Sequence, residues 1–212
     1  MHRTGISEDR VFVLQLLRDQ IGQHIYPVHR LDRATSGVLL FAKTPEIASL
    51  IGQQFMVQAI EKTYFAIVRG YMPADILVDN PVKNENRVAY DAVTHFTCLA
   101  QSELPLAINR YPTSRYSFVK VQPKTGRWHQ IRLHCSHLRH PIIGDKRHGD
   151  NKHNNFLRGY LEQDRLLLHA HELIFQLPNF QKITLHAPMS GEFLQALEKL
   201  ELLPEKTEKY EL

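Results

Sequence analysis

The chain has 212 residues, of which 43% are hydrophobic and 23% are charged. It is long enough for one sizeable core, and none of its apolar runs approaches the roughly 18 residues that suggest a membrane span. The formal net charge of +4 suits an anionic partner such as a nucleic acid without establishing one.

The first predicted element is a helix that Ser7 caps and Gly22 ends. Four apolar residues recur along it at helical spacing: Val11, Leu14, Leu17 and Ile21. The polar segment 29–37 then runs into five consecutive apolar residues, 38–42, which predict a strand buried on both faces. The polar segment is therefore expected at the mouth of this strand.

Pro45 opens a second predicted helix. Its core-facing side is expected to carry Ile47, Leu50, Ile51, Gln54 and Phe55. Aromatic and branched residues predict three further strands over residues 62–68, 92–99 and 116–121. A turn at 123–126 ends the last of them, and residues 129–138 fit a helix with one charged face.

The C-terminal part predicts a β-hairpin and a final helix. Residues 166–177 and 182–186 flank the turn residues Pro178-Asn179. Ser190 precedes the last helix, and we expect the tail 204–212 to be frayed.

Strands and helices mix along the chain without strict alternation. We therefore predict a single α+β domain over residues 1–212, with a mixed, mostly antiparallel sheet flanked by helices. The two cysteines, Cys98 and Cys135, lack the spacing of a zinc knuckle and are interpreted as buried free thiols. Because no secretory signal follows Met1, we expect a cytoplasmic location.

Basic side chains crowd one stretch of the chain, as they do on a surface that contacts phosphates. They are Arg127, His129, Arg132, His134, His137, Arg139, His140, Lys146, Arg147 and His148. Three of the histidines, at 134, 137 and 140, are also near helical spacing and could suggest a metal site. No acidic or cysteine ligand accompanies them, so we expect no metal.

The densest chemical signal is the run HRLDRATSG at 29–37, in which Asp32 lies between Arg30 and Arg33. Positive charges nearby favour the ionised carboxylate. An ionised carboxylate at the mouth of a buried strand is a candidate catalytic group. On spacing alone, a surface loop tied together by salt bridges is equally compatible with this run.

Three separate blocks of the sequence resemble the RluA family of pseudouridine synthases. The first is His29-Arg30-Leu31-Asp32 with Thr35-Ser36-Gly37, the second carries Lys62, Tyr64, Ala66, Val68 and Gly70, and the third is GRWHQIR at 126–132. Leu168-His169-Ala170 also fits the family pattern. The resemblance implies the pseudouridine synthase fold, with the active-site cleft across the sheet.

The resemblance also implies a reaction and its catalytic residues. The N1–C1′ bond of a uridine breaks and C5 joins the same sugar carbon, which requires no redox equivalents and no cofactor. Asp32 would be the nucleophile, Arg132 would pair with it, and Tyr64 would lie against the target uracil. Without the resemblance, Arg132 would be interpreted as a solvated helix residue and Tyr64 as a core residue of a half-buried strand.

RNA contacts are expected from Arg30, Arg33, Arg127, His129 and Arg139. The resemblance implies that Arg30 fills the space left by an extruded uridine. The alternative makes Arg30 a salt-bridge partner of Asp32. Trp128 is interpreted as a packing or stacking residue.

Residues 110–113, 137–145 and 148–149 resemble, in finer detail, the members of this family that act on tRNA. This resemblance implies a tRNA substrate, with the T-stem uridine at position 65 as the target. No protein partner is implied. Two alternatives stay open: an enzyme of the same family that acts on ribosomal RNA, and an inactive RNA-binding module. The family usually has a strand with a Lys-Pro-x-Gly segment before the first helix; His2-Arg3 resembles its remnant, so this strand is expected to be missing.

Overall fold

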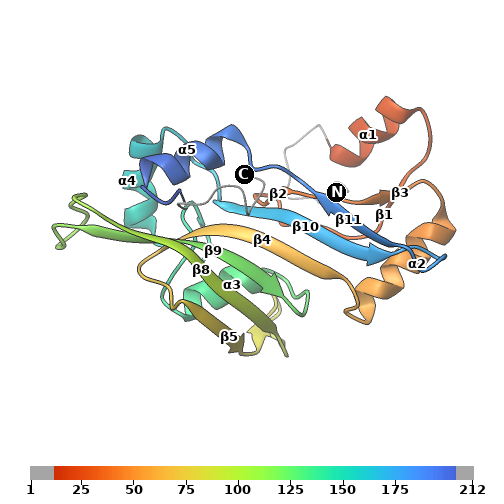
Figure 1. Ribbon diagram of the computed structural model, residues 1–212, viewed down its shortest axis with the longest axis horizontal. Helices are drawn as coiled ribbons and strands as arrows, with labels where there is room; N and C mark the ends of the chain where they lie inside the picture. The colour runs from red at the N-terminus through yellow and green to blue at the C-terminus, as the bar shows by residue number, and fades with distance from the viewer. Residues whose placement is uncertain (1–11, 204–212) are drawn as a thin grey trace.

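The computed structural model describes residues 12–203 (Figure 1). Its strands form a seven-stranded sheet from β2 (Ser36–Gly37), β4 (Glu61–Arg69), β5 (Asp75–Asp79), β8 (Val93–Leu104), β9 (Ser114–Pro123), β10 (Leu168–Gln176) and β11 (Lys182–His186). The strand order is β11-β10-β4-β9-β8-β5, and β2 pairs with β10. Only the β2–β10 pairing is parallel among the described strands. The predicted α+β class with a mostly antiparallel sheet is confirmed.

Four short strands lie outside the main sheet. β1 (Tyr26–Pro27) pairs with β3 (Phe41–Ala42), and β6 (Val82–Lys83) pairs with β7 (Ala89–Tyr90). The prediction of one buried strand over 38–42 is wrong, because the chain changes partner within it. The Val38 N–H donates to the Ala170 carbonyl on β10, whereas the Leu40 carbonyl accepts the N–H of Val28 beside β1.

The described residues form five helices: α1 (Val13–Ile21), α2 (Pro45–Met56), α3 (Gln130–His137), α4 (Asn151–Leu161) and α5 (Gly191–Lys199). The predicted stop of α1 is confirmed, since Gly22 has the left-handed φ of 66° that favours glycine. The proposed cap Ser7 and the tail 204–212 lie outside the described residues. α4 was not predicted, although Asp150 caps it by accepting two backbone N–H groups.

The two faces of the sheet are covered by different helices. On β4, Phe65 and Ile67 point into a core with α4 and α5, whereas Ala66 and Val68 point into a second core with α3. Figure 1 shows α4 and α5 on the opposite side of the sheet from α3. Because side chains alternate along a strand, Lys62 and Tyr64 project from the α3 face.

The predicted free thiols are confirmed, although only Cys135 is fully buried and Cys98 is half-buried. Within residues 12–203, no helix is long and apolar enough to span a bilayer.

Candidate active site

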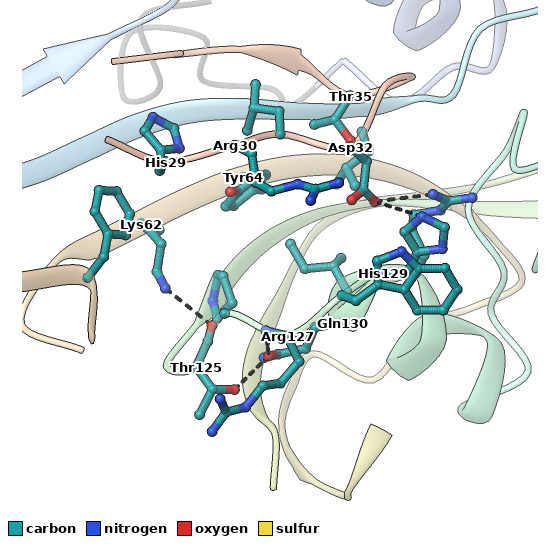
Figure 2. Close-up of a pocket in the computed structure, with 18 of the residues that line it drawn as sticks. His29, Arg30, Asp32, Thr35, Lys62, Tyr64, Thr125, Arg127, His129 and Gln130 are labelled. Atoms are coloured by element: carbon teal, nitrogen blue, oxygen red, sulfur yellow. Dashed lines mark hydrogen bonds and ion pairs between the residues drawn. The ribbon is translucent and has the colours of Figure 1, made fainter. Parts of the chain in front are cut away.

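A cleft of about 460 Å³ opens on the α3 face of the sheet. Its volume lies within the range of roughly 300–1,000 Å³ that is usual for ligand sites. Residues 28–32 with Thr35, here called the active-site loop, form one wall, and Pro123 with residues 125–132 forms the opposite wall. Lys62 and Tyr64 of β4 lie between them (Figure 2).

Contacts hold the active-site loop at both ends, and those after the loop are with β10 of the sheet. After the loop, Gly37 packs so closely on β10 that a Cβ would lie 2.0 Å from the Ala170 carbonyl oxygen. Beside it, the Ser36 hydroxyl hydrogen-bonds the His169 ring at 2.9 Å. At the start of the loop, His29 Nε2 accepts the N–H of Leu40 at 2.9 Å. These contacts fix the place of Asp32 over the sheet.

Asp32 is paired with Arg132, although 100 residues separate them in the chain. Arg132 Nη1 donates to Asp32 Oδ2 at 3.1 Å. The other edge of the guanidinium donates to Asp145, with Nε and Nη2 each 2.8 Å from a carboxylate oxygen. The Asp145 side chain is 1% exposed and the Arg132 side chain 8%, whereas that of Asp32 is 24% exposed.

Asp145 orients Arg132 from the interior. Burial alone would raise the pKa of Asp145, but the Arg132 hydrogen bonds and the N–H groups of Arg147 and His148 outweigh it, so the pKa lies below its ordinary value. With one edge of the Arg132 fork occupied by this ionised carboxylate, the remaining Nη1 is directed at Asp32. The nucleophile candidate is thus the exposed end of an ion-pair chain.

A pair of histidines lies beside Asp32. His129 Nδ1 and His148 Nε2 are 2.8 Å apart, and His129 Nε2 is 3.8 Å from Asp32 Oδ2. Burial lowers the pKa of His129 to about 4 against the opposing effect of Asp32, and burial also lowers the pKa of His148, so both rings are neutral near pH 7. The carboxylate favours the His129 tautomer with its proton on Nε2, and His148 then donates to Nδ1.

The aromatic rim of the cleft is preassembled. Trp128 stacks on His129 with ring centroids 3.8 Å apart, and the Arg147 guanidinium lies 4.6 Å from the centroid of Trp128. The stacking role predicted for Trp128 is therefore seen within the protein itself.

The base of the cleft carries two groups with shifted pKa values. Burial, with a further contribution from Asp32, raises the pKa of Tyr64 to about 12, which keeps its phenol protonated. Burial lowers the pKa of Lys62 to about 8. His29 is neutral, because burial and the nearby Lys62 charge lower its pKa to about 4.

The cleft brings together most of the residues predicted from the sequence. Asp32, Tyr64, Arg132, Arg30, Arg127 and His129 line it. Arg30 is exposed and forms no ion pair within residues 12–203, so the alternative salt bridge to Asp32 is not formed. Arg33 and Arg139 are exposed but lie outside the lining.

The predicted charged face of α3 is only partly solvent-exposed. Arg132 and His134 are buried, because Arg132 pairs with two carboxylates and both ring nitrogens of His134 contact oxygens of Thr94 and Asn80. His140 Nδ1 likewise contacts the Arg69 carbonyl. Within the described part of the chain, no group of His, Cys, Asp or Glu side chains is arranged to hold a metal.

Sequence reasoning missed Asp145, His148 and Lys62 as site residues. Asp145 is an acidic residue next to the basic residues 146–148, and this position was only a weak indication of a functional role. Lys62 belongs to the second sequence block, but its position on the cleft face of β4 became evident only from the fold.

Comparisons with known proteins show the family and the fold of the chain. The sequence profile described as RNA pseudouridylate synthase matches residues 1–137. The chain is 43% identical to tRNA pseudouridine synthase C of Vibrio vulnificus, over 95% of this chain and 87% of the relative. It is 46% identical to the enzyme of that name from Pectobacterium carotovorum, over 88% of this chain but 53% of the relative. The chain thus spans about half the length of the latter.

The solved structure of human RNA pseudouridylate synthase domain containing 4 has the same fold. It superposes with a TM-score of 0.71 at 24% identity, over 91% of this chain and 82% of that chain. At this identity the likeness establishes the architecture alone.

Proposed function

The chain belongs to the RNA pseudouridylate synthase family, and from this membership we propose that it isomerises a uridine in tRNA to pseudouridine with Asp32 as the nucleophile. The observation that carries the proposal is the Asp32–Arg132 pair in the cleft on the α3 face. A carboxylate bound by a guanidinium remains ionised and oriented, as a nucleophile or a base must be.

The contacts of Asp32 support different roles for its two carboxylate oxygens, with Oδ2 in the ion pairs and Oδ1 in the reaction. Within residues 12–203, the ion-pair contacts of this carboxylate involve Oδ2, from Arg132 and from His129. Oδ1 therefore remains available to attack C1′ of the sugar or to take its 2′ proton. Either event breaks the bond between N1 of the uracil and C1′.

The dimensions of the cleft support the entry of a single extruded nucleotide. A uridine within a helix cannot reach Asp32, so it must leave its stack. Tyr64 at the base of the cleft offers an aromatic face to the uracil, and its protonated phenol offers a hydrogen bond. The exposed Arg30 side chain, drawn beside Asp32 in Figure 2, is placed to enter the space that the extruded uridine leaves in the RNA helix.

The proposed substrate is tRNA, and the proposed target is the T-stem uridine at position 65. The names of the Vibrio and Pectobacterium relatives support tRNA as the RNA class. The rival with ribosomal RNA as substrate shares all the catalytic residues and differs only in the RNA class that reacts.

The test is tritium release from RNA labelled at uridine C5, using unmodified tRNA and unmodified ribosomal RNA in parallel. Release from tRNA alone, followed by mapping of pseudouridine to position 65, is the expected result. Release from ribosomal RNA alone would retain the reaction and reject the substrate. Binding of tRNA with no release from either RNA would instead favour the RNA-binding module.

A further inference from the structure

Lys62 is a partly buried cation in the cleft that the pairing of Asp32 with Arg132 leaves unused. Its Nζ donates to the Thr125 carbonyl at 3.2 Å, and no described carboxylate forms an ion pair with it. An ammonium has three donors, so one carbonyl leaves two available. Burying such a charge without a counter-ion costs free energy, which favours a binding role for this group.

The geometry directs Lys62 at whatever lies on Tyr64. The two residues alternate on β4, so their side chains leave the same face about 6.6 Å apart. In Figure 2, Tyr64 lies between Lys62 and Asp32. Across the cleft, a Cβ on Gly126 would be 3.8 Å from Lys62 Nζ, so the glycine leaves the approach to the ammonium open.

We propose that Lys62 is a further catalytic residue, whose ammonium stabilises the negative charge on the uracil while it is detached from the sugar. The inference rests on the proposed function, because it requires a uridine whose sugar is at Asp32 and whose base lies on Tyr64. The far edge of that base, with a carbonyl oxygen, then faces Lys62.

The chemistry creates an anion by either route open to Asp32. When the N1–C1′ bond breaks, its electron pair goes to N1 and is delocalised onto the O2 and O4 carbonyls. C1′ either bonds to Asp32 or becomes part of a glycal after Asp32 takes the 2′ proton. When C5 then bonds to C1′, the carboxylate is displaced or returns its proton, C5 loses a proton and N1 gains one. The product is therefore an isomer of the substrate.

Lys62 forms no covalent bond in this sequence and keeps its proton throughout. A fixed donor aimed at the position where charge develops lowers the barrier more than it tightens ground-state binding. Because the charge is shared by both carbonyls, the ammonium can serve the uracil before and after it turns.

Among the titratable groups around the cleft, Lys62 is the one expected to make the reaction rate fall at alkaline pH. The active-site loop presents His29, Arg30 and Asp32, and residues 125–132 present Arg127, His129 and Arg132. On its own strand Tyr64 has a pKa of about 12, whereas α2 and β10 add only apolar side chains to the lining. The two histidines titrate near pH 4 and the arginines stay charged. Lys62, with its pKa lowered to about 8 by burial, loses its charge as the pH rises through that value.

The experiment compares single-turnover rates and RNA affinities of wild type, Lys62→Met, Lys62→Arg and Lys124→Met between pH 6 and pH 10. Met matches the length of the lysine without its charge, and Arg keeps a charge at every pH used. Lys124 is exposed beside Thr125 and lies outside the cleft lining, so Lys124→Met is the matched control.

We expect Lys62→Met to slow the bond-breaking step about 100-fold with its RNA affinity within about twofold of wild type. The wild-type rate should fall about tenfold per pH unit above about pH 8, and this limb should be absent in Lys62→Met and Lys62→Arg. Lys124→Met should match wild type.

An unchanged rate in Lys62→Met, a loss confined to RNA affinity, or an alkaline limb that persists without Lys62 would overturn the proposal. Should Lys62→Met fail to fold, Lys62→Arg decides: a decline above pH 8 equal to that of wild type also overturns it. Absence of wild-type turnover on tRNA and ribosomal RNA would instead refute the proposed function itself.

Discussion

Replacing Asp145 with Asn tests the ion-pair chain behind the nucleophile. Asp145 accepts two hydrogen bonds from Arg132 and one each from the backbone N–H groups of Arg147 and His148. Asn keeps one acceptor oxygen, but its amide group places a donor against a donor of Arg132 and leaves a buried guanidinium half-paired. Removing one partner of a buried ion pair costs about 3–5 kcal/mol.

That cost is a large part of the roughly 5–15 kcal/mol that stabilises a typical domain. With a urea m-value near the upper end of about 1–3 kcal/mol per molar, the unfolding midpoint should fall by at least about 1 M. The matched control is Asp164→Asn, because Asp164 is 38% exposed and pairs with an exposed Lys146, so its loss should cost less than about 1 kcal/mol.

The same variant should lose activity, because Arg132 is no longer directed at Asp32. We expect single-turnover rates to fall about 100-fold in the folded fraction, which is the effect of a displacement near 1 Å in a catalytic group. The assays are urea unfolding followed by fluorescence of Trp128, and tritium release under native conditions. Wild-type stability together with wild-type turnover in Asp145→Asn would refute the reasoning.

Acid should weaken the ion pair between Asp145 and Arg132 and so lower the stability of the protein. The pKa of Asp145 is held below its ordinary value, since the Arg132 and backbone hydrogen bonds outweigh burial. A depressed folded pKa adds stability that is present above the unfolded value of about 4 and is lost as the pH falls below it. Urea midpoints measured from pH 7 to pH 3 should therefore fall in wild type, and fall less steeply in Asp145→Asn. Parallel curves for the two proteins would contradict this origin of the acid sensitivity.

Three further predictions concern other parts of the site. Gly37→Ala should destabilise the protein by more than about 2 kcal/mol, since its Cβ would meet the Ala170 carbonyl and the φ of residue 37 is 112°. The control is Gly159→Ala, which lies in a helix with open space around it and should stabilise the protein by about 0.5–1 kcal/mol. Equal melting temperatures of Gly37→Ala and wild type would disprove the first prediction. Tyr64→Phe should bind tRNA normally yet turn over at least tenfold more slowly, because the ring remains and the phenol is lost; full turnover would leave the phenol without a role. Phenanthroline, which spares Mg²⁺, should leave turnover unchanged, and a loss restored by added metal would revive the histidine site.

Local sequence patterns predicted most of the elements because the physics involved is local. The left-handed stop at Gly22, Pro45 in the first turn of α2, and the Ser190 cap all act within one helical turn. The interpretation of 38–42 was wrong because an apolar run does not reveal which strands it pairs with.

The sequence predicted the identity of several candidate site residues but only part of their contacts in the fold. The three blocks gave Asp32, Tyr64 and Arg132, which the cleft brings together from segments far apart in the chain. Asp145 was not predicted, because its role depends on the buried guanidinium of Arg132. Without the family resemblance, helical periodicity assigned Arg132 to a solvated face. Long-range ion pairs carry no spacing signal, so sequence reasoning could not find them.

The most direct test of the central claim is the rate of tritium release from tRNA labelled at uridine C5, compared between wild type and Asp32→Asn under single-turnover conditions. Asn preserves the size of the side chain and one acceptor for Arg132, so fold and most tRNA affinity should persist, since phosphate contacts elsewhere dominate affinity. We predict release by wild type and none by Asp32→Asn. Release by Asp32→Asn at the wild-type rate would contradict Asp32 as the nucleophile.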